Sequence, residues 1–320
     1  MVNWSTFVTP TILRRTWNGK CKILSLTVTF LTCGYLTLFV IPVRNVILSS
    51  VIEYGWRDME TSDLIRIHFC QDKEPEGILS STSCPVLHKP QVNVSDIITS
   101  SLVSHDHLLF PEVQRRVLEK GHGRFLPALN LTQKVEILLL YKVAAAALES
   151  VGVQHFLVDG SLLGLSRHGG FVPWDDDLDV SVFLDSWHLV KKALSCIEGF
   201  TLYKPHFAHW KFHYKDRLYP FLDIFFYMLD ESYVWAASYY TRITYIYPKR
   251  FVFPLGESIF EGMKVPVPKD SLSIARRIYE YDLCFAYRGH LKHEASGSED
   301  KGYSISNVSC QELSYMYRFY

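Results

Sequence analysis

A run of acidic residues in the middle of the chain has a spacing suited to metal-dependent chemistry. Asp177 and Asp179 are separated by one apolar residue, in a segment whose pattern predicts a β-strand over 177–184. Side chains two positions apart on a strand point to the same face, so these two carboxylates project together. Asp175 joins that face if the strand begins early, whereas Asp176 points away. Like charges this close are tolerated when a divalent cation neutralises them, and hard carboxylate oxygens suit Mg²⁺ or Mn²⁺.

A third acid comes from a different predicted strand. Asp223 is the one acid in the apolar run 221–228, and a carboxylate there is costly to bury unless it is paired or bound to metal. Asp177, Asp179 and Asp223 are therefore the candidate catalytic residues. Asp223 either completes the metal site or takes the proton from an attacking hydroxyl. The alternatives without a catalytic role are a solvated acidic loop at Asp175 to Asp177 and a structural salt bridge of Asp223.

A glycine–serine pair lies upstream of the acids, where a strand over 155–158 is expected to give way to a helix over 162–167. Backbone N–H groups and a hydroxyl at a helix N-terminus form a good phosphate site. Gly160 and Ser161 are therefore candidate donor-binding residues. Arg167 is expected to hold donor phosphate or to pair with an acid.

The surrounding elements predict an α/β (α+β) fold, with a nucleotidyltransferase-like mixed sheet and flanking helices. A glycine–serine turn, paired acids on one strand and a third acid on a neighbour are the pattern of that fold. In it a metal held by the acids grips phosphates above the turn. Further elements are expected as strands over 64–69, 207–214 and 221–228, helices over 131–150, 187–198 and 271–281 (the last capped by Asp270), and a hairpin over 258–267.

An uncharged apolar stretch over 23–43 predicts one N-terminal transmembrane helix. Basic residues without acidic ones precede it, so the positive-inside rule places the N-terminus in the cytosol and the rest in the lumen. Asn93, Asn130 and Asn307 begin glycosylation sequons on the expected lumenal side. The expectation is a single-pass type II protein of the Golgi or ER membrane. A buried soluble helix and a cleaved signal peptide are the alternatives.

Composition sets broad limits on partners and organisation. Lys plus Arg and Asp plus Glu both number 33 in the 320 residues, which argues against a nucleic-acid partner because such binding needs a basic face. Among seven scattered cysteines, Cys70 and Cys84 are the expected disulfide, because the loop between them is short. The expected organisation is a cytosolic tail at 1–22, the anchor at 23–43, a lumenal stem or accessory region at 44–130, a catalytic domain at 131–285 and a polar C-terminal tail at 286–320.

Several motifs resemble the LicD/fukutin family of phosphotransferases. They are Asp-Gly-Ser-Leu-Leu-Gly at 159–164, the long acidic motif at 167–180, Phe-Leu-Asp-Ile-Phe-Phe at 221–226, Phe-Pro-Leu at 253–255 and the segment 260–268. The resemblance implies a metal-dependent transferase. It would move a phospho-alcohol, such as ribitol phosphate or phosphocholine, from a CDP-linked donor to a glycan hydroxyl and release CMP. The metal ligands that it implies are Asp175, Asp177, Asp179 and Asp223.

The chain departs from the family pattern at two places. Ser181 stands where many members have glycine, and Tyr279-Glu-Tyr-Asp-Leu replaces the usual Tyr-Gly-x-x-Trp. Two other function classes compete: a Golgi glycosyltransferase that uses Asp175–Asp177 as a D-x-D motif, and a non-catalytic, membrane-anchored partner of a glycan enzyme. The alcohol, the acceptor glycan or glycoprotein, and the choice between a homo-oligomer and a complex with other glycan enzymes stay open.

The membrane topology leads to the first testable prediction. Cell-expressed protein should run faster on a gel after endoglycosidase treatment, because at least one of Asn93, Asn130 and Asn307 should carry an N-glycan. Variants with Gln at each position should remove the shift stepwise. An unchanged mobility, together with a C-terminus that cytosolic protease can digest, would overturn the lumenal assignment.

Overall fold

The computed structural model describes residues 22–23, 68–69, 76–82, 84, 97, 111–238, 241–242, 244–288 and 304–320. The chain divides into two compact units, Met1–Glu74 and Pro75–Tyr320. In the first unit, β1 (Lys22–Ile23) pairs antiparallel with β2 (His68–Phe69). Apart from Ile23, the predicted anchor over 23–43 lies outside the described residues. Among the helices that are described, none combines the length and hydropathy needed to cross a bilayer.

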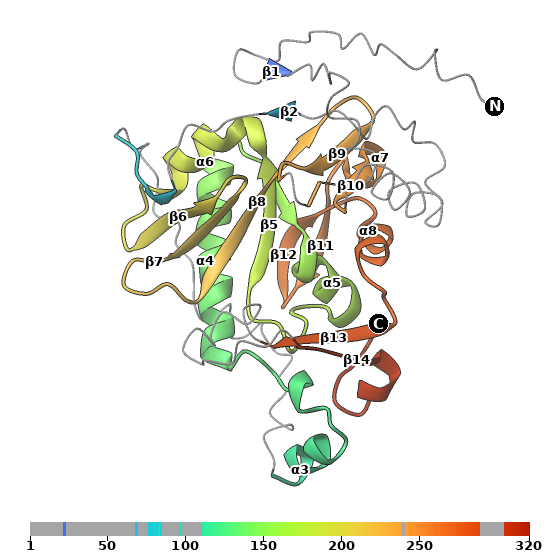
Figure 1. The fold of residues 1–320 in the computed structure, drawn as a ribbon. Coiled ribbons are helices and arrows are strands. Elements are labelled where there is room, and N and C mark those ends of the chain that lie inside the picture. The colour runs from blue at the N-terminus through green and yellow to red at the C-terminus, as the bar shows by residue number, and fades with distance from the viewer. Residues whose placement is uncertain are drawn as a thin grey trace, which may run out of the picture. The chain divides into compact units, whose positions relative to one another are not determined.

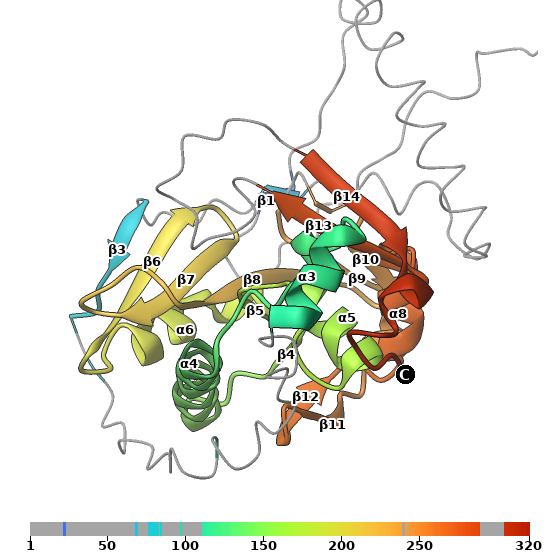
Figure 2. The same cartoon turned by 90° about the horizontal axis from the view of Figure 1, so that it is seen from below.

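The described part of the second unit is built on an eight-stranded mixed sheet (Figure 1, Figure 2). Its centre is β8, which pairs in parallel with β5 and antiparallel with β7 and β9. The outer strands follow as β10 beside β9, β6 and then β3 beyond β7, and β4 beside β5. The strands are β3 (Gly77–Leu79), β4 (His155–Leu157), β5 (Leu178–Phe183), β6 (Phe200–His206), β7 (His209–Tyr214), β8 (Phe221–Leu229), β9 (Tyr233–Ala236) and β10 (Ile246–Pro248).

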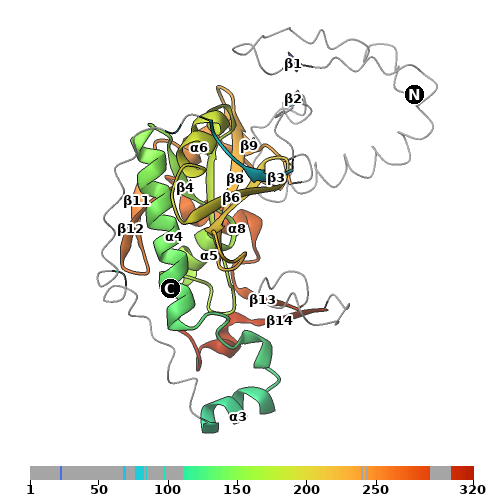
Figure 3. The same ribbon diagram turned by 90° about the vertical axis from the view of Figure 1, so that its left-hand side faces the viewer.

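Helices cover both faces of this sheet. On one face α4 packs against β7, β8 and α6, and on the other α5 packs against β5 and α8 (Figure 3). The helices are α3 (Pro111–Glu119), α4 (Leu131–Ser150), α5 (Asp159–His168), α6 (Trp187–Leu194), α7 (Lys249–Val252) and α8 (Ser271–Ile278), with short 3₁₀ turns η5 (Gly123–Phe125), η6 (Leu184–Ser186) and η8 (Cys310–Leu313). The mixed α/β class expected from the sequence is confirmed.

Local sequence signals fix the ends of several elements. Asn130 accepts a hydrogen bond from the backbone N–H of Gln133, and the Gln133 side chain accepts one in return, which forms a capping box at the start of α4. Asp270 caps α8, as the sequence predicts, because its side chain accepts a hydrogen bond from the backbone N–H of Ser273. The predicted hairpin is also present, as β11 (Gly256–Phe260) and β12 (Met263–Val267) joined by Glu261 and Gly262.

Other boundaries differ from the prediction. Helix α6 ends at Leu194, whereas the amphipathic pattern extends to residue 198. Strand β7 begins at His209, because Ala208 adopts a positive φ of 61° and closes the turn from β6. Of the predicted strand over 64–69, the structure describes only the last two residues, as β2.

The described part of the predicted polar C-terminal tail is folded, which corrects that prediction. Strand β14 (Ser304–Ser309) pairs with β13 (Leu283–Arg288), and the residues after it are buried at Leu313, Met316 and Tyr317. These side chains form one cluster with Val117 of α3 and with Phe125. Figure 2 shows α3 beside the β13–β14 hairpin. The segment 308–319 contains several apolar and aromatic side chains, but their burial depends on contact with residues of α3 and with Phe125, which lie far away in the sequence.

The disulfides also differ from the expected Cys70–Cys84 pair. Cys84 is bonded to Cys196, with a Cα–Cα separation of 5.5 Å, and Cys284 is bonded to Cys310, at 5.0 Å. A disulfide requires Cα atoms about 4.4–6.8 Å apart, which sequence distance does not determine. Here the partner of Cys84 lies 112 positions away, after strands β4 and β5.

Candidate metal centre and donor site

Three of the predicted acidic residues meet above the middle of the sheet. Asp179 on β5 and Asp223 on β8 are direct register partners in the parallel pair, so their side chains leave the same face. Asp177 lies one residue before β5 begins. One carboxylate oxygen from each of the three residues lies within 4.8 Å of the other two. The apolar neighbours Leu178 and Leu222 are fully buried on the opposite face.

A second acidic group lies in the loop that leads into β5. Asp175, Asp176 and Asp177 each offer an oxygen, again within 4.8 Å of one another. Asp175 therefore approaches its neighbours from a loop, and not from an early start of the strand. Asp176 is 2% exposed and belongs to this loop group, but it is not part of the group that Asp177, Asp179 and Asp223 form on the face of the sheet. The loop has no strand pairing and turns side chains in ways that an alternating pattern does not capture.

The acidic cluster fits a hard divalent cation. Burial, and then repulsion by the neighbouring carboxylates, raises the pKa of Asp177 and of Asp179 well above the usual range. A cation among them would favour the ionised forms and offset the repulsion. The donor set consists of carboxylate oxygens from β5, from β8 and from the loop before β5, which suits Mg²⁺ or Mn²⁺ better than a soft metal.

Asp223 is held by two basic side chains that the sequence analysis did not single out. Its Oδ1 lies 2.7 Å from Nε2 of His209 and accepts a hydrogen bond of 2.9 Å from Nζ of Lys211. Burial raises the pKa of Asp223, but these hydrogen bonds and charges outweigh burial, so the pKa is lowered overall. Both partners lie on β7, with Lys211 directly opposite Asp223. His209 and Lys211 are two positions apart in the predicted strand 207–214, and this spacing indicates that they share one face of the strand.

The glycine–serine pair supports the acids by direct contact. The hydroxyl of Ser161 accepts a 2.7 Å hydrogen bond from the backbone N–H of Asp179, and the backbone N–H of Ser161 donates to Asp179 Oδ2 at 3.3 Å. A Cβ at Gly160 would lie 2.6 Å from Asp175 Oδ2, closer than real Cβ atoms come. Glycine therefore lets the acids reach the N-terminus of α5, where the helix dipole favours negative charge.

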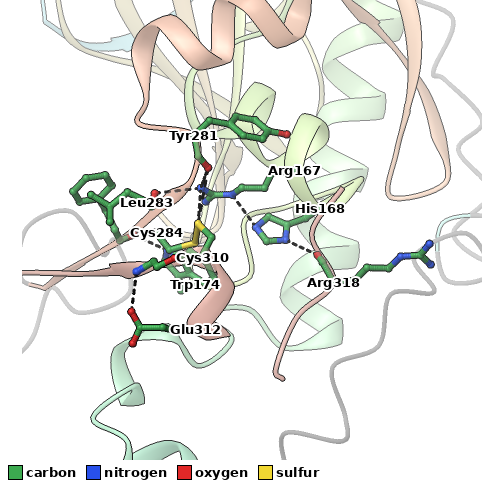
Figure 4. Close-up of a disulfide and its surroundings, with 11 residues drawn as sticks. Arg167, His168, Trp174, Tyr281, Leu283, Cys284, Cys310, Glu312 and Arg318 are labelled. Carbon is green, nitrogen blue, oxygen red and sulfur yellow. Dashed lines mark hydrogen bonds between the residues drawn. A yellow bond between two sulfur atoms is a disulfide. The ribbon is translucent and has the colours of Figure 1, made fainter. Parts of the chain in front are cut away.

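The hydrogen bonds of Arg167 go to the C-terminal part of the chain and to His168, and its charge also interacts with that of Asp175. Its contact with donor phosphate stays a prediction. Its Nη1 lies 3.5 Å from the carbonyl oxygens of Tyr281 and Leu283 and from Sγ of Cys310, and its Nε donates to the His168 ring (Figure 4). Burial lowers its pKa to about 10. Seven helical positions also separate it from Gly160 by roughly 10 Å. Its hydrogen bonds give a structural reason for the arginine in the acidic motif.

Contacts on two sides fix the loop that carries the acids. On one side the Glu261 side chain accepts a 3.1 Å hydrogen bond from the backbone N–H of Phe171, and its own N–H donates to the Gly169 carbonyl at 3.1 Å. On the other side Trp174 Nε1 donates to the carbonyl of Phe285 in β13 at 2.6 Å. Glu261 lies at the predicted hairpin turn, but the turn pattern does not indicate its contacts with Gly169 and Phe171.

The predicted glycosylation sites have different surroundings. Asn130 is exposed, and its Oδ1 caps α4. Asn307 is exposed on β14. Asn93 lies outside the described residues. Glycosylation at all three sites stays a prediction.

Known proteins of the family that the motifs resemble also match this chain. The LicD/FKTN/FKRP nucleotidyltransferase domain model matches residues 152–270, which confirms the resemblance. Ribitol 5-phosphate transferase FKRP from Mus musculus and the protein of the same name from Homo sapiens are each 43% identical to the chain over 44 residues. That segment is 14% of this chain and only 9% of each relative. The similarity is therefore to the nucleotidyltransferase domain and to a short segment of each relative.

Close packing at Gly160 leads to the second prediction. Gly160→Ala should weaken apparent metal affinity, because its Cβ would push Asp175 out of the cluster. Overpacking costs about 1–3 kcal/mol, which corresponds to roughly 5-fold to 150-fold in affinity. Mg²⁺ titration of the variant measures the change. Gly256→Ala is the control, because its Cβ would make only ordinary contact, with Val267 at 3.8 Å. Equal affinity in the two variants would contradict the proposed packing role.

Proposed function

Because residues 152–270 are similar to the LicD/FKTN/FKRP nucleotidyltransferase domain, we propose that the chain is a metal-dependent phosphotransferase. It moves a phospho-alcohol group, such as ribitol phosphate or phosphocholine, from a CDP-linked donor to a hydroxyl of a glycan or glycoprotein. The observation that carries the proposal is the meeting of Asp177, Asp179 and Asp223 beside the N-terminus of α5.

The residues of the cluster have distinct tasks in this mechanism. Asp177 and Asp179 would hold Mg²⁺ or Mn²⁺, with Asp175 as a further ligand from the loop. A cation bound there would supply charge neutralisation for the donor phosphates. The main-chain N–H groups at the start of α5 favour the same negative charge. The protein thereby contributes positioning and electrostatic stabilisation, which dominate phosphoryl transfer.

Asp223 either completes the metal site or accepts the proton of the attacking hydroxyl. Lys211 and His209 hold its carboxylate in place and favour its ionised form. Both roles need that form, so the contacts alone do not choose between them. A base within hydrogen-bond reach of the hydroxyl typically contributes about 10²–10⁴-fold to the rate.

We also propose that the domain is lumenal, in a single-pass type II protein of the Golgi or ER membrane. Two disulfides, Cys84–Cys196 and Cys284–Cys310, support an oxidising compartment. The exposed sequon residues Asn130 and Asn307 support the same side of the membrane. A glycan acceptor would be available there.

The third prediction tests the reaction and its metal. Purified full-length protein, incubated with CDP-ribitol, CDP-choline and related CDP-alcohols, should release CMP from at least one donor. EDTA should abolish the release, and Mg²⁺ or Mn²⁺ should restore it, because the carboxylates repel donor phosphates without a cation. Asp177→Asn and Asp179→Asn should each remove turnover while the melting temperature shows a folded protein.

The comparison variant for that test is Asp216→Asn, which makes the same chemical change at an exposed position outside the cluster. It should keep wild-type turnover. Unchanged turnover in a folded Asp177→Asn, Asp179→Asn double variant would refute the metal mechanism. Turnover of UDP- or GDP-sugars without any CDP-alcohol would instead favour a glycosyltransferase.

The fourth prediction separates the two roles of Asp223. If Asp223 is the base, Asp223→Asn should keep metal and donor affinity but lose turnover by about 10²–10⁴-fold. If it is a ligand, metal affinity should fall as well. Calorimetric Mg²⁺ titration, combined with CMP release at saturating Mg²⁺, distinguishes these results. A folded variant with normal affinity and normal turnover would exclude both roles.

A further inference from the structure

A cavity of about 70 Å³ lies next to the acidic cluster, on the same face of the sheet. Ser181 on β5 and Phe225 on β8 line it, and they are register partners two positions beyond Asp179 and Asp223. Side chains two positions apart share a face of a strand. A donor whose phosphates lie at the acids can therefore extend its organic part into this cavity.

The cavity has aromatic walls. The aromatic residues that line it are Phe156, Phe225, Phe226, Tyr227, Trp235, Tyr245 and Tyr247. Aliphatic side chains, among them Leu162 of α5 and Ile274 and Ile278 of α8, also line it. Aromatic side chains provide surfaces on which a flat base can stack, whereas a polyol would need many more hydrogen-bonding groups than these walls offer. The space admits roughly five water molecules, the scale of a small planar ring.

Asp159 is the one charged side chain among the described residues that line the cavity. Its Oδ1 accepts hydrogen bonds from the hydroxyls of Tyr245, at 2.6 Å, and Tyr279, at 2.8 Å. Among the described residues, both hydroxyls donate to the Oδ1 atom of Asp159. The Oδ2 atom can therefore accept a hydrogen bond from a ligand. Asp159 also has a positive φ of 50°. Such backbone strain is concentrated at functional sites, and here it occurs at the first residue of α5.

We infer that this cavity holds the pyrimidine ring of the donor, and that Asp159 selects cytosine over uracil. The inference rests on the proposed function, because it assumes a pyrimidine nucleotide donor. Burial raises the pKa of Asp159, but the hydrogen bonds from Tyr245 and Tyr279 act against that shift, because they favour the ionised carboxylate, which only accepts hydrogen bonds. It therefore pairs with the 4-amino group of cytosine, which donates, and repels the carbonyl oxygen that uracil has at the same position. The two tyrosine hydroxyls hold the carboxylate in one orientation for this contact.

The fifth prediction is a nucleotide preference that depends on Asp159. Calorimetry on the full-length protein with saturating Mg²⁺ should show that CMP binds roughly 10-fold to 100-fold more tightly than UMP, as expected for a matched against an unmatched hydrogen bond. In Asp159→Asn the amide can present either its oxygen or its nitrogen to the base. The CMP to UMP ratio should therefore fall to about one. Asn also tolerates positive φ, so the backbone should keep its conformation.

A test on the unmodified protein does not depend on folding of the variant. A CMP analogue with hydrogen in place of the 4-amino group should bind roughly 10-fold more weakly than CMP. The control variant is Asp216→Asn, which should keep the wild-type CMP to UMP ratio. Equal binding of CMP and its analogue, or an unchanged ratio in folded Asp159→Asn, would overturn the inference. If CDP-alcohol turnover persisted in either case, the proposed function would stand. No binding of either nucleotide to the wild-type protein would overturn both.

Discussion

Repulsion between carboxylates is the constraint around which this domain is built. Asp179 and Asp223 are adjacent because β5 and β8 pair in parallel at that register. Their negative charge is offset locally by Lys211 and His209 from β7, and by the N-terminus of α5 through Ser161. The strands thereby hold the acids on one face, while apolar side chains on the opposite face pack under α4. The divalent cation that we propose would offset the charge that these contacts leave.

The acidic motif contains residues that act on the scaffold as well as residues that act on the donor. Arg167 and Trp174 donate to carbonyl groups of the C-terminal segment, and a disulfide joins β13 to the residue that follows β14. On the other side of the loop, Glu261 binds the backbone of Phe171. The loop before β5 has no strand pairing of its own, so these contacts determine where its acids lie. Structural support therefore accounts for much of the motif.

Short-range patterns predicted part of this arrangement well. The i, i+2 spacing of Asp177 and Asp179, the capped helix over 131–150 and the hairpin over 258–267 depend on local periodicity, which a single sequence contains. The Cys84–Cys196 bond and the burial of Tyr317 depend on segments that meet only after folding. The pattern also singled out Arg167, but it did not indicate that the guanidinium would contact backbone carbonyl groups of the C-terminal segment.

The two strands that carry the acids also determine where the cavity lies relative to the acidic cluster. Moving two positions along β5 and β8 replaces the pair Asp179 and Asp223 by Ser181 and Phe225, so the same face changes from charged to aromatic. A ligand with phosphates at one end and a flat ring at the other matches that change without any movement of the backbone. Asp159 lies at the boundary, one residue before the glycine that contacts the acids. A single strand pairing thus aligns the acidic cluster with the cavity, and the first turn of α5 lies beside both.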